Sequence, residues 1–150
     1  MSPALDQALK LLGHHARSEA QLRHRLEAKG FAAEEIDAAI ARLKELRYLD
    51  DQAFAESKAL AMVNQEGKGP ALAVRKLEAA GIDEGQAELA VQQARDGMTE
   101  HELALKALER RRPVVGPDSA LAERIKAARW LAGRGFSEET VHTLLRLDEG

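Results

Sequence analysis

A pattern of the form Leu-x-x-x-Gly followed by Phe or Ile occurs three times and divides the chain into thirds. Its glycines are Gly30, Gly81 and Gly135, which lie 51 and 54 residues apart. A glycine at such a position ends a helix in the left-handed conformation, and the apolar residue after it folds back on the last turn. A repeat of this length predicts a tandem array of small helical units.

Apolar residues at fixed distances from these glycines predict the buried faces of the helices. They stand four residues before each glycine and six and ten residues after it, so the two later positions share one helical face. The predicted core positions are Leu26, Leu77, Leu131, Ile36, Ala87, Val141, Ile40, Val91 and Leu145. The core of the first repeat also includes Leu9, Leu12, Leu22 and Leu43.

Start and stop signals predict three helices in each third of the chain. Ser18 with Gln21, and Thr99 with Glu102, have the spacing of a capping box. The predicted helices span residues 3–13, 18–29, 33–46, 51–65, 70–80, 84–96, 99–112, 118–133 and 137–147. The predicted fold class is all-α, with three tandem three-helix-bundle repeats in an elongated, curved array. The predicted repeats span residues 1–49, 50–97 and 98–150.

The composition favours helices over strands. Charged residues make up 31% of the chain and aromatic residues only 3%, whereas strands are rich in aromatic and β-branched side chains. The chain has no cysteine, which excludes disulfides and thiolate chemistry. It has no recognisable export signal and no apolar run of bilayer length. We therefore expect a cytoplasmic protein that makes no membrane contact.

Charge is segregated between the predicted second and third helices of each repeat. The formal net charge of −3 argues against a strongly basic nucleic-acid binder. However, the second helices with their flanking residues are each net +2, over residues 17–29, 68–80 and 118–134. The third helices are net −2 or −3. The near-neutral total thus conceals a repeated separation of charge.

Alignment of the repeats on their glycines places cations at matching positions, such as Arg75 with Arg129 and Arg25 with Lys76. These positions predict a discontinuous basic column that binds phosphates or an acidic protein groove and weakens with salt. The alternative is a solvated face that pairs with carboxylates on neighbouring helices. The candidate residues for binding a partner or nucleic acid are Arg17, Arg23, Arg25, Lys68, Arg75, Lys76, Lys126, Arg129 and Arg134.

Two aromatic residues have more than one interpretation. Trp130 lies between Lys126 and Arg134 at helical spacing, where it could stack on a base or anchor a partner protein. We favour a packing role for Trp130 in a seam between repeats. We interpret Tyr48 likewise as a packing residue at the first junction. A separate apolar stripe on the helix of Trp130 contains Leu121, Ile125 and Ala128.

No motif predicts a cofactor, metal or catalytic site. Gly67-Lys68-Gly69-Pro70 lacks the features of a phosphate-binding loop, because Met62 stands at the first glycine position and no Ser or Thr follows the lysine. Lys68 could still contact an anion beside the next helix N-terminus. The pair His14-His15 has no second cluster with ligand spacing. We therefore expect a protein that is not an enzyme.

One stretch carries a family resemblance. Tyr-Leu-Asp-Asp-x-x-Phe-Ala at residues 48–55, followed by Gly-Lys-Gly-Pro at residues 67–70, is similar to the RecX family of bacterial recombinase regulators. The segments at residues 17–26, 29–31 and 134–137 resemble the same family in the expected order. Together these segments extend over nearly the whole chain, which makes the ordered set more specific than any one motif.

The resemblance implies both a helical layout and a partner. RecX proteins have a three-by-three arrangement of helices and act on the RecA recombinase. They are thought to lie in the groove of the RecA–single-stranded-DNA filament, bridge its protomers, and inhibit strand exchange and ATP turnover. The resemblance thus predicts a non-catalytic monomer that binds this filament, with single-stranded DNA as a further contact. Ala71-Leu72-Ala73-Val74 stands where relatives often carry arginines, which weakens the case for independent DNA binding.

Two other hypotheses remain open from the sequence. The first is a direct DNA-binding protein built from helix-turn-helix-like modules. The acidic third helices disfavour it, because the third helix would enter the DNA groove. The second is a scaffold without a nucleic-acid role. ATP hydrolysis by RecA on single-stranded DNA, with and without the protein, separates these hypotheses.

Overall fold

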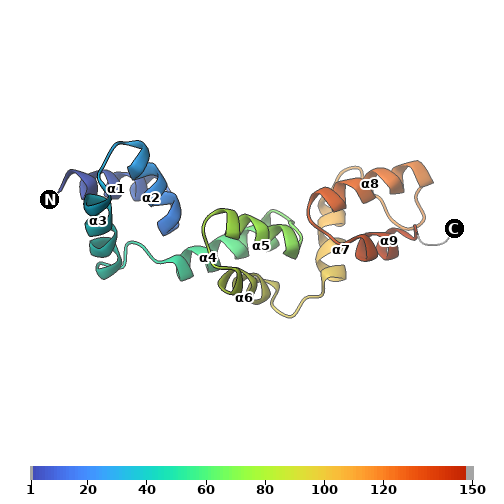
Figure 1. Cartoon of the computed structure of the whole chain (residues 1–150). Helices are drawn as coiled ribbons and strands as arrows, with labels where there is room; N and C mark the ends of the chain where they lie inside the picture. Colours follow the sequence, from blue (N-terminus) through green and yellow to red (C-terminus); the bar gives the residue numbers. More distant parts are fainter. Residues whose placement is uncertain (1, 148–150) are drawn as a thin grey trace.

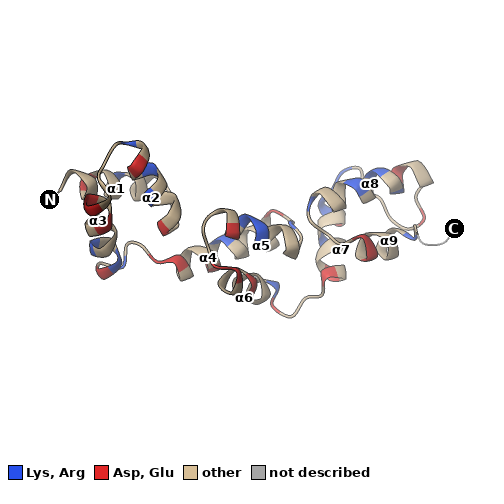
Figure 2. Cartoon of the chain, in the orientation of Figure 1, with Lys and Arg blue, Asp and Glu red and all other residues tan. Residues whose placement is uncertain are grey.

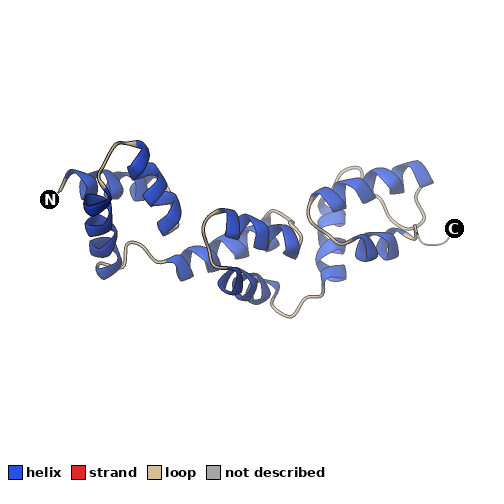
Figure 3. Cartoon of the chain, viewed as in Figure 1, coloured by secondary structure: helices blue, strands red, loops and turns tan. Residues whose placement is uncertain are grey.

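Residues 2–147 are described by the computed structural model of this chain, and every regular element among them is helical (Figure 3). Nine α-helices and one π-helical segment follow one another in this range, and no strand occurs within it. The helices form three successive groups in an elongated, bent row, with the two chain ends at opposite ends (Figure 1). The predicted all-α array is therefore confirmed.

Each group contains three helices, and the longest connection within a group is the loop of residues 111–120 between the first two helices of the third group. The first group consists of α1 (Pro3–His14), α2 (Glu19–Ala28) and α3 (Ala33–Glu45). The second consists of α4 (Asp51–Leu60) with its continuation η1 (Ala61–Gln65), α5 (Pro70–Ala79) and α6 (Glu84–Arg95). The third consists of α7 (Glu100–Arg110), α8 (Leu121–Gly133) and α9 (Glu138–Leu145). The prediction of one regular helix over residues 51–65 missed the π-helical turn η1, whose wider hydrogen bonding often marks functional or strained sites.

Side-chain caps set the starts of several helices. The Ser18 hydroxyl accepts a hydrogen bond from the Gln21 N–H, and the Gln21 side chain accepts one from the Ser18 N–H, both at 3.1 Å. Thr99 and Glu102 form the same capping box before α7. Because the first N–H groups of a helix have no partner within it, these side chains define where α2 and α7 begin.

The three repeated glycines end their helices in one way. Gly30, Gly81 and Gly135 have φ values of 90°, 90° and 93°, a conformation that strains any residue with a Cβ. The residue after each glycine donates its N–H to the carbonyl of the leucine that stands four residues before that glycine, at 3.0 to 3.3 Å. This bond is the signature of a Schellman motif and turns the chain toward the third helix of each group.

The leucines of the repeated pattern lie at the centres of the groups. Leu26, Leu77 and Leu131 have no exposed surface, and the other six core positions predicted from the glycines are also buried. Leu9 and Leu12 in α1 are only partly buried. The buried apolar side chains form one cluster within the first group and a second that extends through the second and third groups. The first group therefore has a core of its own.

The prediction that Tyr48 is a packing residue at the first junction is wrong. Tyr48 is 62% exposed, because the linker between α3 and α4 runs past a cleft at the first junction. Leu121 and Ile125 are also exposed, because α8 directs Ala127 and Leu131 toward the core. Leu131 is the sixth residue after Ile125, so the two side chains lie roughly 120° apart around the helix.

Equivalent positions join neighbouring groups at both junctions. At the first junction the Ser18 hydroxyl donates to the carbonyl of Ala80. At the second the Gly69 N–H donates to the carbonyl of Arg134 at 2.6 Å. Ser18 and Gly69 each precede the second helix of a group, and Ala80 and Arg134 each precede a repeated glycine. The row is thus built by using one type of junction twice.

Candidate partner-binding surface

Positive and negative side chains are unequally distributed among the helices of the array. Lys and Arg outnumber Asp and Glu on α5 and α8, and Asp and Glu outnumber Lys and Arg on α3, α6 and α9, whereas α2 carries two residues of each sign (Figure 2). The segregation inferred from the sequence is therefore clearest in the second and third groups and weaker in the first. Such a separation produces a directional electrostatic field in spite of the low net charge.

Five of the nine candidate residues are exposed and lack an ion-pair or hydrogen-bond partner among residues 2–147. We call this set the basic column. It consists of Arg25, Arg75, Lys76, Lys126 and Arg129. It has members on the second helix of every group. Free cations of this kind can form charge-assisted hydrogen bonds with phosphate or carboxylate oxygens.

Arg23 and Lys68 are held by carboxylates of the chain itself. Arg23 Nη1 lies 2.7 Å from Asp37 Oδ1 and joins α2 to α3. Lys68 Nζ lies 2.6 Å from Glu66 Oε1. The hydrogen bond from Lys68 lowers the pKa of Glu66. For these two cations the structure gives the intramolecular pairing that the solvated-face alternative described.

Arg134 and Arg110 cap the end of η1 with their guanidinium groups. Arg134 Nε donates to the carbonyl of Gly67 at 3.1 Å, and Arg110 Nη2 donates to that of Asn64 at 2.9 Å. The same two guanidinium groups donate to the two intervening carbonyls, Arg110 to that of Gln65 and Arg134 to that of Glu66. The end of a helix presents unpaired carbonyls with partial negative charge, which cations satisfy. Arg134 therefore connects the third group to the second.

Trp130 lies in the seam between the second and third groups, as predicted. The guanidinium carbons of Arg134 and Arg111 lie over its ring, 5.1 Å and 5.7 Å from the ring centroid. The side chain also packs against the shared apolar cluster. Cation–π contacts of this kind fix the two arginines and occupy ring surface that a stacked base would need. Trp130 is thus mainly a structural residue.

Arg17 is buried rather than exposed, with only 9% of its surface accessible. Its Nε donates to the carbonyl of Leu11 at 3.3 Å, near the end of α1. Burial, and to a lesser extent the charge of Arg25, lowers the pKa of Arg17 from its ordinary value. Arg17 lines a cleft between the first and second groups.

Three consecutive arginines, at residues 110–112, were not among the candidates predicted from the sequence. Arg110 and Arg111 lie beside Trp130 and Arg134 around a small hollow in the seam, and Arg112 is exposed. The run itself was the signal, because three adjacent cations at a helix end raise the local positive potential whichever way they point. These residues extend the positive surface of the third group.

The site is suited to binding anions. Among the described residues, no three His, Asp or Glu side chains come together as a metal site would require. No helix in the described part of the chain is both long and apolar enough to span a bilayer. The basic column offers charge without an enclosed pocket, so its binding should be electrostatic and sensitive to salt.

Comparisons with known proteins agree with the repeated architecture. The family description "RecX, first three-helix domain" matches residues 4–43. Regulatory protein RecX of Chlorobaculum tepidum is 34% identical over 146 residues, which cover 97% of this chain and 88% of the relative. Regulatory protein RecX of Geobacillus thermodenitrificans is 30% identical over 143 residues, or 95% of this chain and 52% of the relative, so this chain spans about half its length. The crystal structure of RecX from Lactobacillus salivarius has a TM-score of 0.76 and 25% identity, covering 97% of this chain and 94% of that one.

Proposed function

Because this chain belongs to the RecX family, we propose that it is a non-catalytic regulator that binds the RecA–single-stranded-DNA filament and inhibits its strand exchange and ATP hydrolysis. Its relatives carry the name regulatory protein. The observation that carries the proposal is the basic column, whose exposed cations recur on the second helix of all three groups. A filament repeats its subunits, so a row of repeats can contact several of them at once and gain from multivalency.

We further propose that the protein acts as a monomer in the cytoplasm. Its three repeats are residues 1–49, 50–97 and 98–150. The proposal includes no cofactor. The groove of such a filament holds both RecA and single-stranded DNA, so the basic column would meet carboxylates of the protein, phosphates of the strand, or both. Recurring cations would strengthen binding to either, and added salt would weaken it.

Direct binding to duplex DNA is the less favoured alternative. The third helix of each group would have to enter a groove lined by phosphates. On α6, however, Glu84 and Glu88 are exposed, and their charges would be repelled there. The same exposed carboxylates would be harmless on a face directed away from a filament.

The test is cosedimentation with preformed RecA filaments on single-stranded DNA, combined with the rate of ATP hydrolysis by RecA. We expect the protein to sediment with the filaments, to lower the hydrolysis rate, and to do both less well as salt is raised. Naked single-stranded and duplex DNA at equal nucleotide concentration serve as controls. Equal binding to naked duplex DNA without any effect on hydrolysis would favour the DNA-binding alternative.

A further inference from the structure

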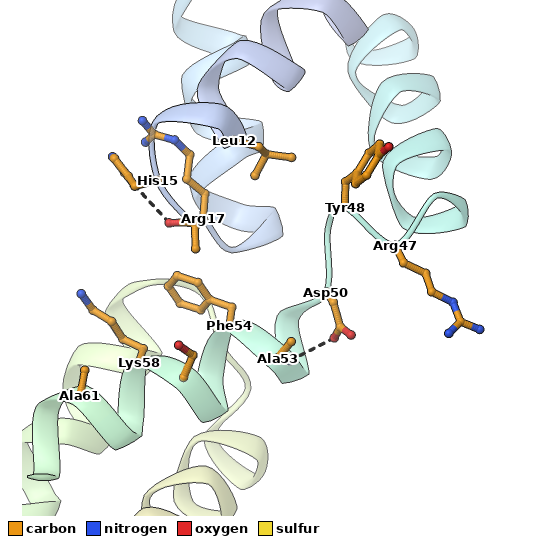
Figure 4. Close-up of a pocket in the computed structure, with 12 residues that line it drawn as sticks. Leu12, His15, Arg17, Arg47, Tyr48, Asp50, Ala53, Phe54, Lys58 and Ala61 are labelled. Atoms are coloured by element: carbon orange, nitrogen blue, oxygen red, sulfur yellow. Dashed lines mark hydrogen bonds between the residues drawn. The ribbon is translucent and has the colours of Figure 1, made fainter.

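A cleft of about 630 Å³ lies between the first and second groups. In Figure 4, Phe54 and Lys58 project from α4 toward the loop that carries His15 and Arg17, while Tyr48 stands on the far side, in the linker. The apolar lining residues are Leu12, Ala16, Ala53, Phe54 and Ala61. The cleft thus combines an apolar floor with polar groups around it, which is the usual composition of a binding site.

The charged groups around this cleft are mainly positive. Arg17, Arg47 and Lys58 all line it, and none of the three is paired with a carboxylate within residues 2–147. Asp50 is the single carboxylate in the lining. Its Oδ1 accepts the hydrogen bond of the Ala53 N–H at 3.1 Å and so caps α4. The cleft therefore has uncompensated positive charge beside an apolar surface.

Tyr48 adds an exposed aromatic side chain at the edge of the cleft. It is 62% exposed, although its place in the linker suggested packing. Tyrosine and arginine are enriched at the centres of protein interfaces, because each combines a large contact area with hydrogen-bonding capacity. The exposed Tyr48, together with the exposed cations Arg47 and Lys58 in the same lining, matches the composition of a docking site.

The cleft also separates two parts of the molecule with independent cores. One apolar cluster lies within the first group, and the other begins at Phe54. The two parts are otherwise joined by polar contacts, such as the hydrogen bond from the Glu19 N–H to Asp51 Oδ1 at 2.8 Å. A ligand in the cleft would touch both parts and would fix the angle between them.

We propose that this cleft binds an acidic peptide segment of a partner protein, with one apolar side chain on Phe54 and a flanking carboxylate on Lys58. Charge complementarity excludes a basic segment. A nucleobase is disfavoured because its polar edges would lose their hydrogen bonds to water on a floor that offers no replacement. The inference goes beyond the proposed function, since the basic column and the cleft involve different residues.

Fluorescence anisotropy with a labelled, short acidic peptide that has one central phenylalanine tests the proposal. We expect saturable binding to the full chain, and loss of most of it when serine replaces the phenylalanine or lysines replace the acidic residues. The double variant Tyr48→Ser with Lys58→Glu should weaken binding by at least about tenfold. A matched variant, Leu89→Ser with Lys106→Glu, changes an exposed apolar and an exposed basic residue elsewhere and should leave binding unchanged.

Circular dichroism of each variant establishes that the helices are retained. The proposal is overturned if the acidic peptide does not bind the native chain, or if the cleft variant and the matched variant bind it equally. It is also overturned if labelled oligothymidine, rather than the peptide, loses affinity in the cleft variant. Cosedimentation with RecA filaments is measured in parallel, so loss of peptide binding with retained filament binding distinguishes this site from the basic column.

Discussion

Gly69 and Gly135 lie in backbone contact, so that a Cβ at residue 69 would be 2.5 Å from both the carbonyl carbon and oxygen of Gly135. At the first junction Ala20, the second residue of α2, lies against Gly81 in a similar way. A repeated glycine therefore has two roles. It ends its own helix, and it lets the preceding group approach closely. Gly30 ends α2, but a Cβ at this position would meet nothing within 4 Å among the described residues.

We predict that Gly69→Ala destabilises the junction between the second and third groups. The φ of Gly69 is −68°, which alanine adopts without strain, so the effect comes from the collision alone. Because backbone atoms are the obstacle, we expect a loss of roughly 1–3 kcal/mol in the free energy of unfolding. The matched change Gly133→Ala meets nothing within 4 Å and should be neutral or stabilising by up to about 1 kcal/mol. Urea unfolding measures both, and equal stability of the two variants would contradict the contact.

We predict that Leu77→Ala lowers the free energy of unfolding by about 2–5 kcal/mol, because its side chain is fully buried and a cavity would remain. Leu89→Ala, on the exposed side of α6, should change it by less than about 0.5 kcal/mol. The measurement is the urea midpoint with its slope. An unchanged midpoint for Leu77→Ala would mean that the repeated leucines do not form the core.

The sequence predicted those parts of the structure that depend on local spacing. Leu77 and Gly81 are four residues apart, so helix geometry alone places one in the core and the other at the helix end. Tyr48 was misplaced because a linker has no periodicity that reveals its surroundings. The exposed half of the candidate site, such as Arg75, followed from the charge pattern. The structural role of Arg134 could not be predicted from the sequence, because its carbonyl partner Gly67 is 67 residues away in the chain.

We predict that Arg134→Ala destabilises the seam, since it leaves the carbonyls of Glu66 and Gly67 without their charged donor. Hydrogen bonds from charged groups contribute about 1.5–3 kcal/mol, so a loss of that order is expected. Trp130 is the only tryptophan, and its fluorescence should shift because a cation leaves its ring. Arg129→Ala is the control, because Arg129 is exposed and unpaired in the described range. A similar change in both variants would argue against a role for Arg134 in joining the second and third groups.

We predict a pH dependence of stability that depends on Glu100. Burial alone would raise its pKa, but hydrogen bonds from Ser137 and Thr140 outweigh burial and lower it. One of these bonds comes from the Ser137 N–H at 3.1 Å and links α7 to α9. Because the folded pKa is the lower one, the stabilisation is complete above the unfolded pKa and is lost as the pH falls through the folded pKa.

Glu100→Gln should therefore be less stable than the native chain near neutral pH and should approach it in stability as the pH becomes acidic. The measurement is the urea midpoint of both proteins across that range. Glu139→Gln is the control, because Glu139 is exposed and has no such contact. Glu102→Gln is unsuitable, because Glu102 belongs to a capping box. A constant difference in stability between Glu100→Gln and the native chain at every pH would contradict the assignment.

We predict that Arg75→Glu with Lys76→Glu abolishes most of the inhibition of RecA ATP hydrolysis. Both side chains are exposed and unpaired in the described chain and belong to α5, in the middle group. Reversing their charge removes two attractions and introduces two repulsions at a surface that should meet carboxylates or phosphates, so affinity should fall by at least about tenfold. Folding should persist, because the buried face of α5 is formed by Ala73 and Leu77.

The matched control reverses charge on the acidic helix α6, with Glu84→Lys and Glu88→Lys. Both glutamates are exposed, and the double change has the same magnitude but the opposite sign. If general electrostatic attraction to the filament determined binding, this control would strengthen inhibition, because the whole molecule becomes more positive. If the basic column binds directly, the control should leave inhibition near the native level while the Arg75 and Lys76 variant loses it. Inhibition that persists in the latter variant at equal protein concentration would reduce the basic column to a solvated face.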